Sequence, residues 1–476
     1  MLNLTLFKTK KLPLLFTLIS AVLYFVFAYN LQRTQHLSLV LIYTILFVLF
    51  YFLLNHNKEN IKFLTAIAFV FRAIFILAIP NLSQDFYRFI WDGRMVFEGY
   101  NPYLYTPEFF ISKSQFPIAQ SQELYIGMGE LNAGHFTNYP PINQLCFLIA
   151  GLFAGKSIVG SAMVLRLLII AADFGTLYFG KKLLIKLKLP KYNIFWFILN
   201  PFIIIELTGN LHFEGVMIFF LVWSLYLLHC NKWKLAAVVF ALSIATKLVP
   251  LMFLPLYFWW FCKRIVVAKE TNQPVKNNEI SASQTPSKEV WNGMTTLVTF
   301  YIIIIVTTLL LFSPFFSSQF IDNYSKTVGL WFGNFEFNGS IYYIAREIGY
   351  LFRGWNEIAI IGKILPIITI IFILYLSFFK KNIDVKKLIA AMLFSFTIYL
   401  FLSTTVHPWY IATILILSVF TNYKFPLIWS FVVIISYLAY ANVDNTENLW
   451  IIGLEYLAVF SVFICEVFIN KKATNW

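Results

Sequence analysis

The sequence predicts an all-α polytopic membrane protein, and three observations carry this prediction. Of the 476 residues, 60% are hydrophobic, only 12% are charged, and the mean hydropathy is +0.75. A soluble domain has too little interior to bury so large an apolar fraction. The apolar residues also come in runs, many of them near the roughly 20 residues that an α-helix needs to cross a bilayer.

The apolar runs predict a bundle of about 13–14 transmembrane helices. The runs 234–247 and 248–262 are short, and together they favour a broken hairpin. Another apolar run, 139–154, is too short to span, and we expect it to form a re-entrant or interfacial helix. The expected spans lie at about 12–30, 37–54, 61–80, 160–180, 192–208, 213–230, 234–247, 248–262, 294–313, 357–379, 388–406, 409–421, 425–441 and 449–469.

The distribution of basic residues predicts the orientation of these spans. With the N-terminus in the cytoplasm, most of the 36 Lys and Arg residues fall at cytoplasmic span ends, as the positive-inside rule requires. Two long loops, 81–160 and 314–357, then lie on the extracytoplasmic face, where we expect interfacial helices. The one sizeable cytoplasmic loop, 263–290, is polar and is expected to be a solvated linker.

Charge and cysteine content exclude other classes of protein. The formal net charge is +14, but the basic residues cap spans instead of clustering on one folded face, so we expect no nucleic-acid partner. The first apolar run follows a Lys-rich segment and lacks a small-residue cleavage site, which favours a retained helix over a signal peptide. The four cysteines are far apart in apolar surroundings, and they predict neither a disulfide framework nor a metal site: Cys146, Cys230, Cys262 and Cys465.

The first long loop opens with an unusual concentration of charge. Asp85, Arg88 and Asp92 are spaced i, i+3 and i+7, so a helix would place them on one face, with Arg94 close by. Such a segment is compatible with an interfacial amphipathic helix whose charges pair with one another. It is equally compatible with an active site at the membrane surface. The length of the loop, without a domain of its own, favours a function.

Further polar residues fall at predicted outer ends of spans. His212 and Glu214 occupy a very short outer turn, where they either cap two spans or contribute to a site. Lys247 stands between the two short runs, next to Pro250. A lysine inside a span costs a few kcal/mol unless it is paired or hydrated. It is therefore either a snorkelling side chain or a cation for a lipid phosphate.

Two aromatic motifs complete the candidate residues. Glu336 and Asn338 lie among phenylalanines in the second long loop, a pattern that suits an interfacial helix or a sugar-binding segment. His407 and Tyr410 lie at the outer end of a later span. Aromatic residues there are expected as an interfacial belt, whereas a His followed by Pro is less expected.

In this order the motifs resemble those of the C-type (GT-C) membrane glycosyltransferases, nearest to bacterial mannosyltransferases that use a polyprenyl-phosphate-mannose donor. The resemblance runs from about residue 61 to 425. It implies three parts of the chain: an extra N-terminal transmembrane pair, 1–60; a catalytic membrane core, 61–425; and a C-terminal transmembrane pair, 426–476. The motifs that carry it are 85–94, 99–103, 139–141, 200–214, 247–250, 335–338 and 407–410.

The resemblance implies an enzyme that moves a hexose, with mannose as the expected sugar, to a glycan or lipid-linked acceptor on the extracytoplasmic face of the cell membrane. Asp85 matches the general base of an inverting transfer. Lys247, Arg88 and Arg94 are the cations available for the donor phosphate, and no metal or other cofactor is expected. The residues expected to bind substrate are Asp92, His212, Glu214, Glu336, Asn338, His407 and Tyr410.

Two other functions remain open at this point. A lipid or glycan transporter or flippase would also explain charged residues and broken spans. Against it, the two halves of the chain show no internal repeat, and the polar motifs gather on one face instead of at mid-membrane. A glycan polymerase or ligase with a diphosphate-linked donor is the second alternative.

Overall fold

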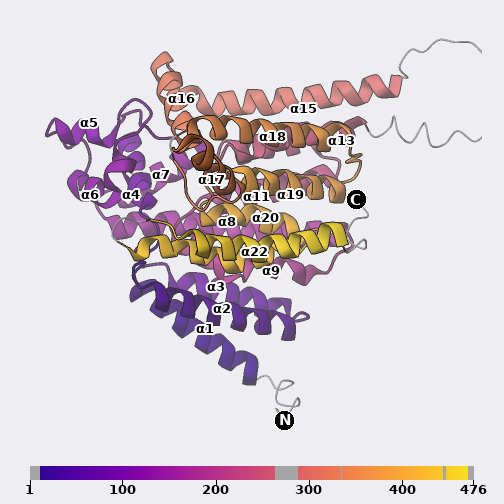
Figure 1. Cartoon of the computed structure of the whole chain (residues 1–476), viewed down its shortest axis with the longest axis horizontal. Helices are drawn as coiled ribbons and strands as arrows, with labels where there is room; N and C mark the ends of the chain where they lie inside the picture. The colour runs from indigo at the N-terminus through magenta and orange to yellow at the C-terminus, as the bar shows by residue number, and fades with distance from the viewer. Residues whose placement is uncertain (1–10, 263–287, 334, 443–445, 470–476) are drawn as a thin grey trace, which may run out of the picture.

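A computed structural model describes residues 11–262, 288–333, 335–442 and 446–469 (Figure 1). These residues form helices and connecting turns, with one isolated bridge between Phe337 and Thr405 and no strand among them. The predicted all-α class is therefore confirmed. Most of the expected linker 263–290 lies outside the described residues, and so does Asn334 in the second long loop.

The first half of the chain contains three helices, a cluster of shorter helices in the first long loop, and a second group of apolar helices. The first three are α1 (Lys11–Tyr29), α2 (His36–His56) and α3 (Ile61–Ile74). The loop cluster is α4 (Asp85–Phe97), α5 (Pro107–Ser112), α6 (Ser121–Ala133) and α7 (Pro141–Ala154). Then follow α8 (Ile158–Lys186), η2 (Lys191–Ile194), α9 (Phe195–Ile198), α10 (Pro201–Ile203), η3 (Ile204–Gly209), α11 (Glu214–His229), α12 (Trp233–Ile244), η4 (Val249–Tyr257) and α13 (Phe258–Cys262).

The second half contains a smaller loop cluster and a third group of apolar helices. It begins with α15 (Lys288–Phe312), η5 (Ser313–Phe315), α16 (Ser318–Gly333) and α17 (Ile341–Arg353). The remaining elements are α18 (Ile358–Phe378), α19 (Val385–Leu402), η6 (Pro408–Tyr410), α20 (Ile411–Val419), α21 (Phe425–Val432), η7 (Val433–Ala441), α22 (Leu449–Ile464) and η8 (Cys465–Ile469). In Figure 1 the loop helices α4–α7, α16 and α17 gather at one end of the bundle.

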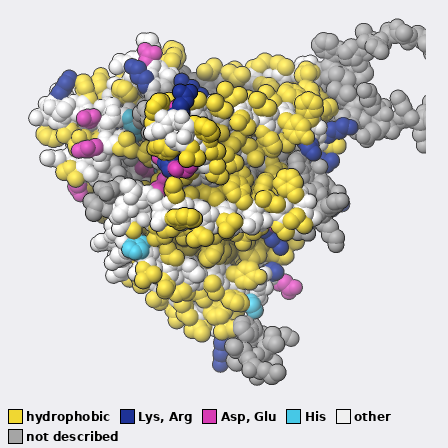
Figure 2. Space-filling model, in the orientation of Figure 1, with side chains coloured by type: hydrophobic (Ala, Val, Ile, Leu, Met, Phe, Trp, Pro, Cys, Tyr) yellow, Lys and Arg dark blue, Asp and Glu magenta, His cyan; other side chains and the backbone are white. Residues whose placement is uncertain are grey.

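Within the described residues, seven helices are long and apolar enough to cross a membrane. A bent pair, Lys191–Ile198 with Pro201–Gly209, counts as an eighth span if its halves are joined. Six further apolar helices have 10–17 residues, and the expected 13–14 spans include several of these shorter helices. Hydrophobic side chains cover most of the flank seen in Figure 2. The chain is thus a multi-pass membrane protein.

Two expected spans differ in detail from the structure. The span expected at 61–80 ends as a helix at Ile74 and continues in turns. The run 192–208 bends by 50° between Ile198 and Pro201. Asn200 and Pro201 explain the bend, because the Asn200 side chain accepts a hydrogen bond from the Phe202 amide and begins a new helix with proline at its first position.

A glycine contact holds the first loop cluster together. Helices α4 and α7 cross so closely that a Cβ on Gly93 would lie 2.1 Å from the carbonyl oxygen of Phe147. Across the same contact, a Cβ on Gly151 would lie 3.0 Å from the carbonyl oxygen of Gly93. The ring of Phe89, on α4, also stacks on Phe147 at 4.7 Å. The position of α4, which begins at Asp85, therefore depends on this close packing.

Gly93→Ala is expected to destabilise the protein strongly, because the added methyl group meets backbone that cannot rotate away. Overpacking typically costs about 1–3 kcal/mol or more. The thermal unfolding temperature in detergent measures the effect. Gly453→Ala in α22 is the matched control, since a Cβ there has no described atom within 4 Å. Equal unfolding temperatures for both variants would show that the α4–α7 contact is looser than described.

Candidate active site

A cavity of about 780 Å³ opens among the loops at one end of the bundle. Its wall draws on segments from every part of the chain, including the first long loop, the α12–η4 connection and the second long loop. All of these segments are outer ends in the predicted alternation of spans. Six of the expected site residues line it: Asp85, Glu214, Lys247, Glu336, His407 and Tyr410.

Asp85 is the first residue of α4 and lies half-buried in the cavity wall. Its Oδ1 accepts a hydrogen bond of 3.1 Å from Nδ2 of Asn132, which lies in the last turn of α6 in the same loop cluster. Burial raises the pKa of the Asp85 carboxyl above its usual range, although Asn132 and the charge of Lys247 act in the opposite direction. A carboxylate with a raised pKa is a stronger proton acceptor than an exposed one.

Arg88 and Asp92 lie behind Asp85 and outside the cavity lining. The two side chains form a buried ion pair of 2.8 Å. Arg88 Nη1 also donates to the carbonyl oxygens of Asn132, at 2.6 Å, and His135, at 2.9 Å. Arg88 thereby holds the end of α6, which carries Asn132 to Asp85. The sequence predicted that Asp85, Arg88 and Asp92 share one face of a helix. Of these three residues, only Asp85 lines the cavity.

Lys247 and Glu214 form an ion pair of 2.8 Å in the cavity wall. Glu214 begins α11, and Lys247 lies in the connection between α12 and η4. The start of α7 holds this connection, because the Ile142 amide donates to Ala245 O and the Asn143 side chain donates to Thr246 O. The Lys247 side chain is 22% exposed and lines the cavity.

An aromatic stack forms another part of the wall. The His407 ring stacks on Trp409 with ring centres 4.5 Å apart, and the His212 ring also stacks on Trp409, at 3.7 Å. His407 and Trp409 line the cavity, whereas His212 is buried behind Trp409. Burial, aided by the charge of Lys247, lowers the pKa of His407 to about 3, so that the ring is neutral at physiological pH.

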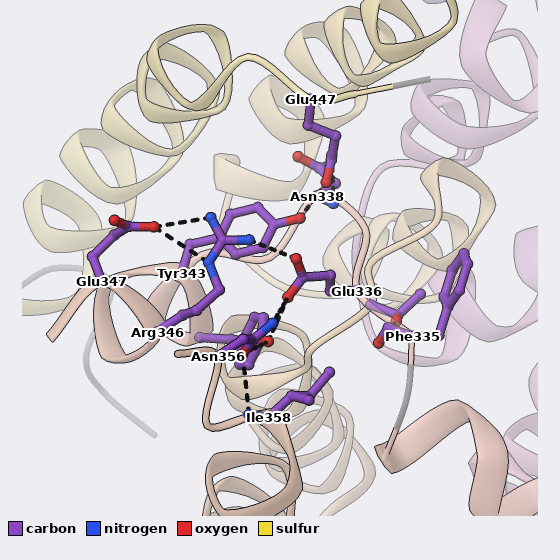
Figure 3. A network of polar contacts seen from close by, with 11 residues as sticks. Phe335, Glu336, Asn338, Tyr343, Arg346, Glu347, Asn356, Ile358 and Glu447 are labelled. Atoms are coloured by element: carbon purple, nitrogen blue, oxygen red, sulfur yellow. Dashed lines mark hydrogen bonds and ion pairs between the residues drawn. The ribbon is translucent and has the colours of Figure 1, made fainter. Parts of the chain in front are cut away.

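The second long loop closes the wall through the polar network in Figure 3. Glu336 lines the cavity and accepts hydrogen bonds from Arg346 at 2.5 Å, Tyr342 at 2.5 Å and Asn356 at 3.2 Å. The Glu336 carboxylate therefore has three hydrogen-bond donors within the protein. Arg346 lies over the Tyr343 ring at 4.5 Å, which ties α17 to this network.

Two other expected residues do not reach the cavity. Arg94 is buried and donates to the carbonyl oxygen of Ala119 at 2.6 Å and to the Gln120 side chain. Asn338 is fully buried, and its side chain donates to Glu455 of α22 at 3.1 Å. Both residues join segments of the protein, in contrast to the phosphate and sugar contacts that the sequence suggested for them.

Sequence reasoning missed several residues of the wall. Glu447, in the turn before α22, lines the cavity and accepts hydrogen bonds from the Asn338 amide, at 2.7 Å, and from Tyr343. Tyr437 lines it as well and donates to Glu206 at 2.9 Å. The predicted alternation of spans puts the Glu447 turn on the same side as Asp85, so the sequence did contain a signal for this residue. The other missed wall residues include Arg33, Ser83, Asn132, His135, Tyr139, Trp409 and Tyr440.

An all-helical membrane bundle that holds an acid, a cation and aromatic side chains in one end cavity defines a polytopic membrane protein with a site for a polar ligand. The family match then gives the activity. Residues 13–263, just over half of the chain, match the MptA_B family, described as alpha-(1->6)-mannopyranosyltransferase, N-terminal domain. The chain belongs to this GT-C family and is a membrane mannosyltransferase. No curated protein matches the sequence.

Proposed function

We propose that the protein transfers mannose from a polyprenyl-phosphate donor to a glycan or lipid-linked acceptor, with inversion, on the extracytoplasmic face of the cell membrane. The observation that carries this proposal is the cavity itself, which combines Asp85, Lys247 and an apolar strip in one wall. These are the three groups that such a transfer needs: a proton acceptor, a cation for the leaving phosphate and a place for the lipid chain.

Asp85 is the proposed general base. It takes the proton of the acceptor hydroxyl while the hydroxyl oxygen attacks the anomeric carbon of the donor. The bond from that carbon to the phosphate oxygen breaks in the same step, and the phosphate leaves with the bonding electrons. A single displacement inverts the anomeric configuration. The raised pKa of Asp85 and its hydrogen bond from Asn132 support this role.

Lys247 is the proposed partner of the donor phosphate, and the residues after it form a path for the lipid. Leu248, Val249, Leu251 and Met252 line the cavity directly after Lys247. Leu251 is 42% exposed, so this strip extends from the cavity to the outside of the bundle. A polyprenyl chain that follows the strip would bring its phosphate to the Lys247 ammonium, where charge develops as the bond to the sugar breaks.

A donor comparison tests the proposed function. The purified full-length protein in detergent is incubated with polyprenyl-phosphate mannose, with a diphosphate-linked glycan or with a nucleotide-linked mannose, and transfer to octyl α-mannoside is measured. We expect transfer from the polyprenyl-phosphate donor alone. Transfer from the diphosphate-linked or nucleotide-linked donor instead would overturn the proposed donor class.

The pH dependence of transfer is expected to show an acid limb that belongs to Asp85. The carboxylate accepts a proton only when it is ionised, so activity falls as the pH drops through its pKa. Because burial raises that pKa, the limb should lie above about 3.9, the ordinary value for aspartate. The residual activity of Asp85→Asn should lack this limb. The same limb in both proteins would assign it to another group.

A labelling experiment tests the proposed face. After replacement of the native cysteines, Ser114→Cys in the first long loop is expected to react with a membrane-impermeant thiol reagent on intact cells, because Ser114 is exposed. Lys186→Cys, at the last residue of α8, is the matched control and should react only after lysis. The reverse pattern would place the cavity on the cytoplasmic side.

A further inference from the structure

Arg33 brings a second cation to the cavity from an unexpected part of the chain. It lies in the connection between α1 and α2 and lines the same cavity as Asp85. Its guanidinium carbon is 4.7 Å from the centre of the Tyr440 ring, which belongs to η7 and lines the cavity too. The side chain is half-buried there.

The connection that carries Arg33 is held in place from two sides. Asn81 donates from one side-chain amide to the carbonyl oxygens of Phe27, at 2.7 Å, and Leu31, at 2.9 Å. Asn81 precedes Asp85 by four residues, so the end of α1 is tied to the start of α4. On the other side, the Tyr43 hydroxyl of α2 donates to Ser430 O of α21, which leads directly into η7. Arg33 and Tyr440 are thus positioned by packed elements.

The charge of Arg33 has no acidic partner within the part of the chain that the structure describes. Lys247 is neutralised by Glu214, and Glu336 by Arg346. Among the described residues no carboxylate lies within ion-pairing distance of Arg33, whose identified contact is the face of Tyr440. An arginine stacked on an aromatic ring keeps its N–H groups directed outward, in the fork that matches a phosphate or carboxylate.

We propose that Arg33, seated on Tyr440, is a second anion-binding position of the cavity and takes a phosphate or carboxylate group of a substrate. This inference rests on the proposed function, which supplies the substrates. This position differs from that of Lys247. Arg33 lies in the α1–α2 connection and contacts Tyr440, whereas Lys247 lies in the α12–η4 connection and pairs with Glu214. The anion comes either from the donor phosphate or from an acidic group on the acceptor.

Arg33→Gln tests the proposal, because it removes the positive charge. Arg33→Lys keeps the charge but lacks the paired N–H groups of the guanidinium. The matched control is Lys113→Gln, which removes an exposed cation 3.9 Å from the Phe109 ring in the first long loop, outside the cavity lining. Two quantities are measured for each full-length protein. One is the affinity for polyprenyl phosphate without a sugar; the other is the pair kcat and KM for a neutral octyl mannoside and for a mannoside linked to a lipid phosphate.

If the anion is the donor phosphate, Arg33→Gln should bind polyprenyl phosphate about tenfold or more weakly, and the ligand-induced rise in its unfolding temperature should shrink. If the anion belongs to the acceptor, donor affinity and transfer to the neutral mannoside should persist. In that case KM for the phosphate-linked mannoside should rise about tenfold or more. Arg33→Lys should lie between wild type and Arg33→Gln in either case.

The proposal is overturned if Arg33→Gln matches wild type in all these measurements, as Lys113→Gln should. It is also overturned if transfer to both mannosides falls equally while donor affinity stays constant, because no anion is then involved. Failure of the proposed function gives a different result: the wild-type protein would transfer no mannose from the polyprenyl-phosphate donor. The binding of polyprenyl phosphate and of the phosphate-linked mannoside to Arg33→Gln would then decide the role of Arg33, because weaker binding of either supports it and unchanged binding of both overturns it.

Discussion

Asp85→Asn is expected to lower the single-turnover rate of mannose transfer by about 10²–10⁴, the usual effect of losing a general base. Asparagine has the same size and can still accept the hydrogen bond from Asn132 through its side-chain oxygen. It cannot accept the proton of the acceptor hydroxyl. The rate is measured with a saturating donor, and donor affinity is determined separately, so that a loss of binding is not mistaken for a loss of chemistry.

Asp92→Asn is the matched control, since it makes the same chemical change on the same helix, behind the cavity. Its expected effect is on stability, because Asp92 is the buried partner of Arg88. Removing one partner of a buried ion pair typically costs about 3–5 kcal/mol, which appears as a lower unfolding temperature. The folded fraction should keep most of its transfer rate. Near wild-type turnover in Asp85→Asn together with an inactive Asp92→Asn would exchange the two roles.

Lys247→Ala is expected to weaken donor binding by about 10- to 150-fold, since a charge-assisted contact to a phosphate is typically worth about 1.5–3 kcal/mol. The measured quantity is the dissociation constant for polyprenyl phosphate in detergent. This variant also leaves Glu214 with a buried, unbalanced charge, because the Glu214 side chain is only 4% exposed. A lower affinity of the single variant alone would therefore have two explanations.

The double variant Lys247→Ala with Glu214→Gln separates them. If Lys247 only neutralises Glu214, the neutral glutamine should restore donor affinity, since no charge is left unbalanced. If Lys247 binds the phosphate, the double variant should stay as weak as the single variant. Wild-type affinity in a well-folded Lys247→Ala protein would leave Lys247 as a snorkelling side chain and would assign the phosphate to another cation of the cavity, with Arg33 as the first candidate.

Much of the fold could be predicted from local sequence. The long apolar runs predicted the membrane bundle, and Asp85 was expected near the start of the first long loop, where the structure begins α4. Hydropathy is a sum over neighbouring residues, so it needs no knowledge of tertiary contacts. The bend at Pro201 and the early end of α3 were harder to predict from the sequence, because a run of apolar residues does not show where its helix breaks.

The candidate site was only partly predictable, and Arg88 shows why. A charged residue on an amphipathic helix has the same sequence signature whether it faces a cavity or a set of backbone carbonyls. The end of α6 and the turn after it decide between them by presenting the carbonyls of Asn132 and His135 to Arg88. Asn338 is a second case: its motif suggested sugar binding, but the contact with Glu455 depends on α22, more than a hundred residues later.

By itself, the sequence determined the membrane class, the approximate spans and the grouping of the polar motifs at one end of the bundle. These properties depend on local apolar content and on the alternation of spans. Only the tertiary structure decided which polar side chains open to the cavity and which are satisfied inside the protein. It also brought Arg33 from the first connection and Glu447 from the last turn into one wall with Asp85. Such pairing depends on packing between segments hundreds of residues apart, which no local pattern records.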